Sequence, residues 1–309
     1  MSRRKPRAKL YSPRAWPTWL VVAMAWPLAR LPLTWLLALG RGFGRAAWHL
    51  ALRRRHITRV NLALCFPELD AAARERLGRL SFEHAGVSVA EMVLVWLNPG
   101  RRLESRFTVC GVEHLTAAQA RGRGVLVVSG HFSCIDVASQ PVSDRVELDV
   151  MYRENKNPVW EWLQVRGRRR YFDGVVERDD TRQALRRLKQ GRTLWYAADQ
   201  DYGPRHSVFA PFFGVPAATI TATARLARLN GSPVVFLSQF RDLDRATWEV
   251  RFHPPLENFP SGDEVADATR INHEIETAVR AHPEQYLWAH RRFKTRPPGA
   301  ADLYGLRRR

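Results

Sequence analysis

The stretch VLVVSGHFSCID, residues 125–136, contains the pattern that decides the fold. Its first five residues form an almost uninterrupted apolar run, which is typical of a strand buried on both faces of a sheet. Gly130 then permits a turn, and a helix is expected to begin directly after it. Functional groups of α/β proteins gather at the carboxyl ends of strands, so His131 is the first candidate functional residue.

Short apolar runs alternate with helical patterns along most of the remaining chain. Alternation of this kind is typical of a sheet with parallel neighbours. We therefore expect an α/β fold with a mixed or mostly parallel central sheet flanked by helices and preceded by an N-terminal membrane helix. Further strands are predicted at 148–152, 174–177, 193–198, 233–240 and 247–252, and helices at 70–97, 159–165, 181–189, 219–229 and 263–281.

The N-terminal region combines basic residues with a long apolar segment, residues 16–40, which one charge, Arg30, interrupts. As a helix it would be about 36 Å long at about 1.5 Å per residue, enough to cross a bilayer core. Pro27 and Pro32 are expected to kink it. Basic residues flank both ends, which favours the cytoplasmic side for each. We expect a membrane anchor, kinked or partly inserted, with a buried core helix as the alternative.

The pattern divides the chain into four segments. Residues 1–45 are the basic N-terminus and membrane anchor, and 46–100 a helical membrane-proximal segment. Residues 101–296 are the α/β domain, and 297–309 a loose basic tail.

The charge balance indicates an anionic partner. Lys and Arg number 49 and Asp and Glu 30, so the net charge is 49 − 30 = +19. Nucleic acid, a membrane surface and acidic substrates all fit this excess. The 3 cysteines form no CxxC pair, which excludes a disulfide framework and argues against a structural zinc site. The sequence also has no P-loop, GxGxxG, HExxH or GxSxG motif, so the chemistries that depend on them lack their signatures.

His131 and Asp136 form the first candidate catalytic pair. If a helix starts after Gly130, Asp136 lies about one turn beyond His131, where its carboxylate would accept a hydrogen bond from the imidazole. Such a pair suits a general base that activates an alcohol. The alternatives are a structural histidine, since the spacing alone arises readily by chance, and a nucleophilic Cys134 activated by His131.

A second group of polar residues follows the strand predicted at 193–198. Asp199, Asp201 and Arg205 lie in a loop with a Gly-Pro turn, and Arg153 and Arg178 follow two other predicted strands. Arginines that converge on one sheet edge are typical of a phosphate or acidic-carrier site, so these five residues are the candidate substrate-binding residues. A structural turn and solvated surface arginines are the alternatives. Two carboxylates without further oxygen ligands are weak evidence for Mg²⁺, and we expect no metal.

These residues resemble the late (secondary) acyltransferases of lipid A biosynthesis in Gram-negative bacteria. The resemblance extends over most of the chain, and its DQDYGPR loop and Asp136 favour the lauroyl-type branch. The matching blocks are YSPR at 11–14, NLALCFPEL at 61–69, the His-x-x-x-x-acid motif at 131–136, Tyr152-Arg153, RDD at 178–180, WYAADQDYGPRHSVFAPFF at 195–213, PEQYLW at 283–288 and HRRFK at 290–294.

The resemblance implies a glycerolipid-acyltransferase-like fold and an enzyme at the bacterial inner membrane, with its catalytic domain on the cytoplasmic side. It would move a fatty acyl chain from acyl carrier protein to a hydroxyl of a 3-hydroxyacyl chain on a Kdo-bearing lipid A precursor. The family's dyad carries over to His131 and Asp136, and acyl carrier protein serves as co-substrate without another cofactor. The alternatives are a glycerolipid or lysophospholipid acyltransferase and, from another class, a membrane-tethered nucleic-acid-binding protein. We expect membrane lipids and no nucleic acid among the partners.

Overall fold

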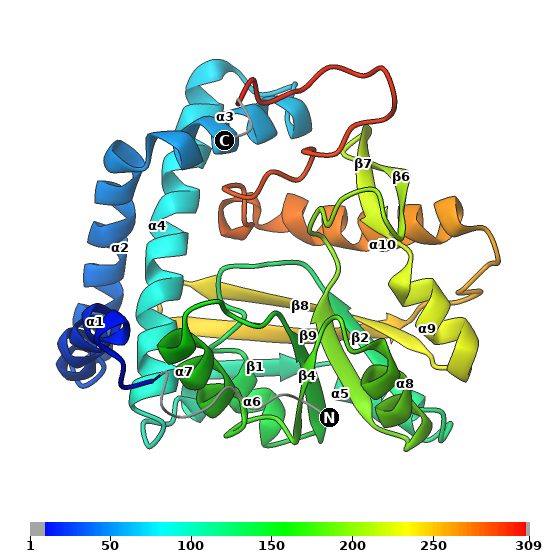
Figure 1. Cartoon of the computed structure of the whole chain (residues 1–309), viewed down its shortest axis with the longest axis horizontal. Helices are drawn as coiled ribbons and strands as arrows, with labels where there is room; N and C mark the ends of the chain where they lie inside the picture. The colour runs from blue at the N-terminus through cyan, green and yellow to red at the C-terminus, as the bar shows by residue number, and fades with distance from the viewer. Residues whose placement is uncertain (1–9, 307–309) are drawn as a thin grey trace.

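The computed structural model describes residues 10–306 and confirms the α/β fold with a mostly parallel sheet (Figure 1). Within these residues the main sheet has seven strands, and all neighbours are parallel except β8 and β9. The order is β1-β9-β8-β2-β5-β3-β4. The strands are β1 (Phe107–Cys110), β2 (Val125–Ser129), β3 (Leu148–Tyr152), β4 (Gly174–Glu177), β5 (Thr193–Ala197), β8 (Val234–Asp242) and β9 (Thr247–Pro255).

Strand β2 is buried on both faces, as its apolar run predicts. Leu126 and Val128 join one hydrophobic core, and Val125 and Val127 join the other, because successive side chains of a strand point to opposite faces. One core includes side chains of α3 (Leu52–Cys65), α8 (Thr181–Lys189), α9 (Ala222–Asn230) and α10 (Glu264–Ala281). The other includes side chains of α2 (Leu33–Leu50), α4 (Ala71–Leu97), α5 (Val112–Gln119) and α6 (Ser139–Ser143).

The apolar N-terminal segment is two helices, so the segment expected to be a helix kinked at its prolines is instead broken between residues 28 and 33. Helix α1 (Trp16–Leu28) ends before Pro32, and α2 starts at Leu33. Arg30 turns back at the break, where its guanidinium donates to the carbonyl of Trp26 at 2.7 Å and stacks on that indole at 3.4 Å. The 13 residues of α1 span about 20 Å, less than a bilayer core of about 30 Å.

Among the residues that the structure describes, α4 is the one helix that is long and apolar enough to cross a membrane. Half of its most apolar 18-residue stretch is buried inside the protein. Gly44 of α2 packs against α4 so closely that a Cβ there would lie 2.1 Å from the carbonyl oxygen of Phe82. A core helix meets the same length and hydropathy criteria, so this finding alone is weak support for a membrane span.

The hairpin β6 (Ser207–Phe212) and β7 (Val215–Ile220) was not predicted. Its two-residue turn, Phe213-Gly214, has φ of 51° and 74°, a turn for which Asn-Gly is the usual sequence signal. The helix expected at 219–229 therefore begins only at Ala222. Helix α7 (Pro158–Arg168) is longer than predicted because Asn157 caps it, its side chain accepting from Val159 N at 2.9 Å.

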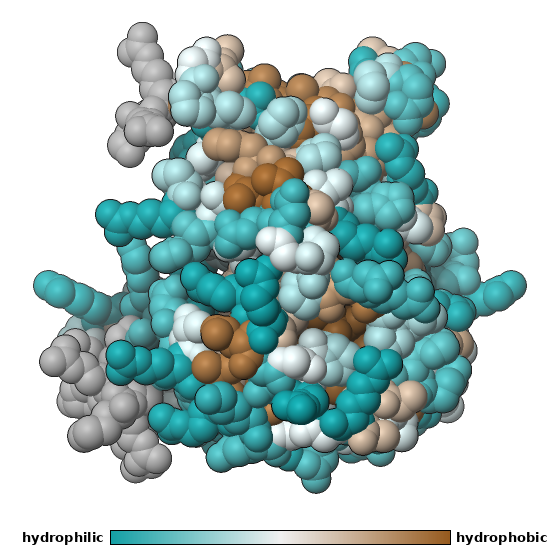
Figure 2. All heavy atoms as spheres, turned by 90° about the vertical axis from the view of Figure 1, so that its right-hand side faces the viewer, coloured by the Kyte–Doolittle hydropathy of each residue, from teal (hydrophilic) through white to brown (hydrophobic). Residues whose placement is uncertain are grey.

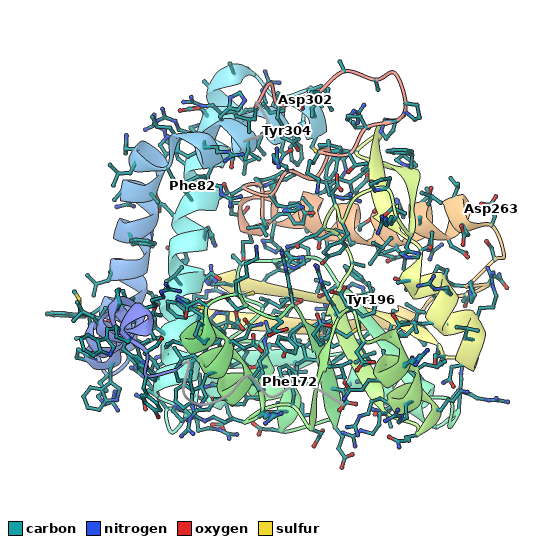
Figure 3. All side chains as sticks on the ribbon, viewed as in Figure 1. Phe82, Phe172, Tyr196, Asp263, Asp302 and Tyr304 are labelled. Atoms are coloured by element: carbon teal, nitrogen blue, oxygen red, sulfur yellow. The ribbon has the colours of Figure 1, made fainter. Side chains whose placement is uncertain are left out.

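The described C-terminal segment has an exposed stretch at 298–302 but is anchored at Tyr304, so the expectation of a loose tail is wrong for that residue. Tyr304 is buried against α3 (Figure 3), where its hydroxyl donates to Asn61 Oδ1 at 2.6 Å and accepts from Phe293 N at 3.0 Å. Residues 307–309, and the basic run predicted before residue 10, lie outside the described residues. Short 3-10 turns complete the fold at η2 (Pro13–Ala15), η3 (Glu104–Arg106) and η4 (Pro283–Gln285).

Candidate active site

His131 and Asp199 are brought together by two adjacent parallel strands. His131 follows β2 and Asp199 follows β5, with Ser129 opposite Ala197 in the register. The Asp199 carboxylate contacts His131 twice: Oδ1 meets the ring nitrogen Nδ1, and Oδ2 accepts the backbone N–H at 2.9 Å. A carboxylate at Nδ1 holds the proton there and leaves Nε2 as the basic nitrogen.

Asp199 is held in its charged form. Burial pushes its pKa upward, but the charge and hydrogen bonds of His131, together with the Tyr286 hydroxyl, outweigh burial and hold the pKa well below its ordinary value. The carboxylate is 2% exposed and the His131 side chain 27% exposed. The pair therefore presents an imidazole to solvent and substrate with a buried anion behind it, the arrangement that stabilises an imidazolium.

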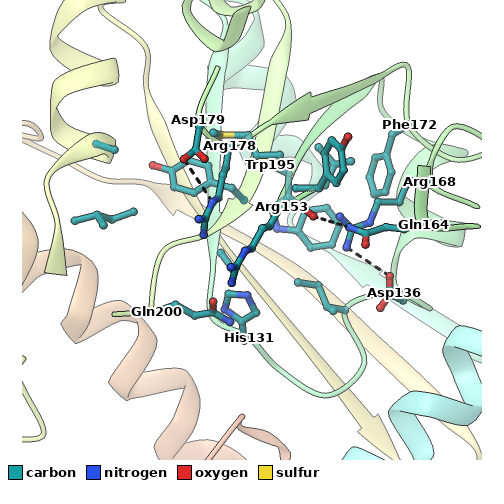
Figure 4. Close-up of a pocket in the computed structure, with 18 of the residues that line it drawn as sticks. His131, Asp136, Arg153, Gln164, Arg168, Phe172, Arg178, Asp179, Trp195 and Gln200 are labelled. Carbon is teal, nitrogen blue, oxygen red and sulfur yellow. Dashed lines mark hydrogen bonds and ion pairs between the residues drawn. The ribbon is translucent and has the colours of Figure 1, made fainter. Parts of the chain in front are cut away.

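Asp136 does not occupy the position that the sequence predicted for it. Residues 133–138 form turns, and the helix expected directly after Gly130 begins only at Ser139. Asp136 instead faces Arg168 of α7, with Oδ1 and Nη2 3.8 Å apart (Figure 4). The predicted hydrogen bond between His131 and Asp136 is thus replaced by the bond to Asp199. Burial raises the pKa of Asp136, and the nearby charges of Arg168 and His131 oppose the rise.

A cavity of about 770 Å³ opens in front of His131. Its polar lining includes Arg153, Arg178 and Arg205, so the structure brings the three predicted arginines together. Figure 4 shows Arg153 and Arg178 in this cavity. The Arg178 guanidinium lies 4.7 Å from the centre of the Tyr202 ring. The apolar lining, which the sequence did not predict, consists of Val95, Trp96, Ile135, Val150, Met151, Tyr171, Phe172, Trp195, Ile220 and Leu226, among other residues.

Asp201 lies outside this cavity lining. Its carboxylate accepts from Gly203 N at 2.8 Å, Thr295 N at 2.6 Å and Thr295 Oγ1 at 2.8 Å, and Lys294 Nζ lies 3.5 Å away. These contacts tie the loop after β5 to the C-terminal segment. The geometry is that of a structural residue and does not support the predicted substrate contact. Within residues 10–306, no group of three His, Cys, Asp or Glu side chains is arranged to hold a metal ion.

Cys134 is poorly suited to nucleophilic catalysis. Its side chain is buried, and burial raises the pKa of the thiol to about 12 although Arg241 opposes the rise. The thiolate is the nucleophilic form of cysteine, so almost none is present near neutral pH. The geometry therefore favours His131 as a base over a covalent Cys134 route.

A buried ion pair supports the loop that carries His131. Arg241 Nη2 and Glu91 Oε2 are 2.5 Å apart, and both side chains are almost completely buried. The Arg241 guanidinium also donates to the carbonyl oxygen of Ser133 at 2.9 Å and to its hydroxyl at 3.1 Å. Glu91 accepts a further hydrogen bond from Trp248 Nε1 at 2.7 Å. The pair links α4 and β8 to the residues directly after His131.

Replacing Glu91 should destabilise the fold strongly, because Arg241 would keep a buried charge without its counterion. We expect Glu91→Ala to lower the free energy of unfolding by about 3–5 kcal/mol, measured by denaturant or thermal unfolding of the purified protein. Glu249→Ala is the matched control. This variant removes the ion pair between Glu249 and Arg251, whose side chains are 43% and 46% exposed. We expect it to lower the free energy of unfolding by less than about 1 kcal/mol. Equal losses in both variants would contradict the role of the buried pair.

The chain is similar to acyltransferases of bacterial lipid A biosynthesis. The family described as bacterial lipid A biosynthesis acyltransferase matches residues 3–295. The chain is 38% identical to the lipid A biosynthesis lauroyltransferase of Escherichia coli strain K12 over 296 residues, 96% of this chain and 97% of the relative. It is 37% identical to the palmitoleoyltransferase of the same strain, with 94% and 95% covered. Identity to the strain's myristoyltransferase is 30%, with 94% and 91% covered, so the similarity favours the predicted lauroyl-type branch.

Proposed function

Because the chain belongs to the bacterial lipid A biosynthesis acyltransferase family and is an acyltransferase, we propose that it takes its acyl chain from acyl carrier protein. The acceptor is a hydroxyl of a 3-hydroxyacyl chain on a Kdo-bearing lipid A precursor. The observation that carries the proposal is the His131–Asp199 pair, whose imidazole lines a large, partly apolar cavity. A volume of about 770 Å³ is within the usual range for a small-molecule site and leaves room for an acyl chain.

His131 acts as the general base. Nε2 takes the proton from the acceptor hydroxyl as its oxygen attacks the thioester carbonyl, forming the ester C–O bond. Asp199 stabilises the resulting imidazolium through Nδ1. Collapse of the tetrahedral intermediate breaks the C–S bond, and the imidazolium returns the proton to the departing thiolate. The predicted dyad is thereby revised, with Asp199 in the orienting role first assigned to Asp136.

Asp136 remains in the proposal as a residue that lines the cavity beside Arg168.

The cavity arginines supply the anion-binding part of the site. Arg153 and Arg178 follow neighbouring parallel strands and point into the cavity (Figure 4), and Arg205 lines it as well. Guanidinium groups bind phosphate through paired hydrogen bonds, which suits the phosphates of the lipid A precursor or of the carrier's prosthetic group. Arginine near the thioester also suits stabilisation of the oxyanion.

The N-terminal helices supply the membrane contact in this proposal. Large apolar side chains are exposed along α1, α2 and the start of α3, and they form what we name the apolar face: Trp16, Leu20, Val21, Met24, Trp26, Leu28, Trp35, Leu39, Phe43, Leu50 and Leu52. Such a surface suits insertion into one leaflet, and α1 is too short to span the bilayer. We propose attachment to the inner membrane with the catalytic domain on its cytoplasmic side.

The test is an assay of the purified protein with acyl carrier protein thioesters and a Kdo-bearing lipid A precursor. The expected product is the precursor heavier by one fatty acyl group, identified by mass spectrometry. A lysophospholipid acceptor is the comparison. Preferential acylation of the lysophospholipid would contradict the assigned acceptor, and transfer from acyl-coenzyme A alone would contradict the assigned donor.

A further inference from the structure

Helices α8 and α9 contact each other and carry exposed basic side chains that we name the α8–α9 face: Arg182, Arg186, Lys189, Arg225 and Arg228. Arg228 lies 3.9 Å from Asp267. The other four have no ion pair among residues 10–306. Of the two carboxylates at the start of α8, Asp180 caps the helix and Asp179 pairs with Arg178. Most of the positive charge on this face is therefore available to a partner.

The pattern of α8 explains why its basic residues point outward. Ala184 and Leu188 are four residues apart and pack into the core. Arg182, Arg186 and Lys189 follow one another at intervals of four and three, so they share the opposite side of the helix. Arginine and lysine keep their heads in water there, and no partner within the chain is needed to stabilise them.

The α8–α9 face borders the active-site cavity. Thr181 at the start of α8 and Arg225 of α9 both line it. The other end of the cavity is lined by Trp96 of α4 and by residues of α7, and α4 and α7 both contact α1. The cavity thus runs from the side of the apolar face to the side of the basic one.

The two faces lie on different sides of the molecule. In Figure 1, α1 and α2 stand at the left, and α8 and α9 at the right. Figure 2 looks onto the right-hand side, which is predominantly hydrophilic with small apolar patches. A surface that enters a membrane needs apolar side chains as well as charge. Among the described residues of α8 and α9, Leu229 is the one large apolar side chain that is exposed. The apolar face carries many such side chains.

We propose that the acidic carrier protein docks on the α8–α9 face and delivers its acyl thioester into the cavity beside Thr181 and Arg225, while the lipid acceptor enters from the side of the apolar face. This inference rests on the proposed function, since it requires a protein-bound donor. Unpaired arginines at an interface rim speed the encounter with an acidic surface and orient it. Separate routes let both substrates occupy the cavity at once, as direct transfer requires.

The test compares a carrier-bound and a small donor in Arg182→Glu/Arg186→Glu. With acyl carrier protein as donor, we expect KM to rise about tenfold or more. With acyl-pantetheine, which lacks the protein, kcat/KM should stay within twofold, which also reports that the variant is folded. High salt should weaken the wild type's use of the carrier far more than its use of acyl-pantetheine, because exposed charges are screened. Arg76→Glu/Arg245→Glu, the same charge change on α4 and the β8–β9 turn, should leave both donors unaffected.

Three results would overturn the docking site: an unchanged KM for the carrier, an equal loss with both donors, or a loss of binding to phosphatidylglycerol vesicles in place of the loss with the carrier. The failure of the proposed function is distinguishable, because the wild type would then be inactive with both donors. A wild type that uses the carrier, together with a variant that uses it equally well, contradicts only the docking site.

Discussion

His131→Ala is expected to reduce acyl transfer by about 10²–10⁴-fold while leaving the fold intact. General-base catalysis contributes on this scale, and the ring is the group that the structure presents to the cavity with a buried anion behind it. The measurement is the initial rate of transfer to the lipid A precursor. Thermal unfolding of the same preparation should stay close to that of the wild type, since the side chain is 27% exposed.

His273→Ala is the matched control, because His273 lies exposed on α10 and should be dispensable. Activity above about a tenth of the wild-type rate in His131→Ala would remove His131 from the mechanism. Cys134→Ala addresses the covalent alternative. It should retain transfer, and no acyl group should be trapped on the wild-type enzyme, because burial keeps the Cys134 thiol protonated. A trapped acyl-enzyme lost in Cys134→Ala would contradict direct transfer.

The strands that build the site were predictable because each is a short apolar run followed by a polar residue. That rule placed His131, Arg153, Arg178 and Asp199 at the carboxyl ends of strands, and the structure has all four there. The partner of His131 was not predictable from local spacing. Asp199 is 68 residues further along the chain, and the contact depends on β2 and β5 being neighbours, which no residue near His131 specifies.

The errors elsewhere have similar causes. A helical register was assumed after Gly130, but Ser133 N donates to the carbonyl of Gln285 at 2.8 Å, and Phe132 bridges Tyr286. These tertiary contacts hold residues 131–138 out of a helix and carry Asp136 away from the imidazole. Tyr286 itself, which supports the charge on Asp199, comes from the C-terminal block and has no spacing relation to His131. The break between α1 and α2 was visible in Pro27 and Pro32, but their effect on span length was underestimated.

Asp199→Asn is expected to cost about 10³-fold or more in turnover, because it changes the proton position on His131 rather than the geometry. A carboxylate accepts from both the backbone N–H and Nδ1–H of His131. An asparagine has one acceptor oxygen and a donor NH₂. If the oxygen keeps the backbone N–H, the NH₂ faces Nδ1 and favours the tautomer with its proton on Nε2, which is not a base toward the substrate.

The proton on His131 Nδ1 can be observed directly. If Asp199 had only a structural role, replacing it with asparagine would not change this proton. In the wild type the Nδ1 proton shared with Asp199 should give a far-downfield proton NMR signal that disappears in Asp199→Asn and His131→Ala. Asp136→Asn is the discriminating control: it alters the carboxylate that was predicted to pair with His131 but faces Arg168 instead, and the signal should remain. A signal lost in Asp136→Asn and kept in Asp199→Asn would return the orienting role to Asp136. A full rate in Asp199→Asn would show that neither the proton position nor the buried anion limits transfer.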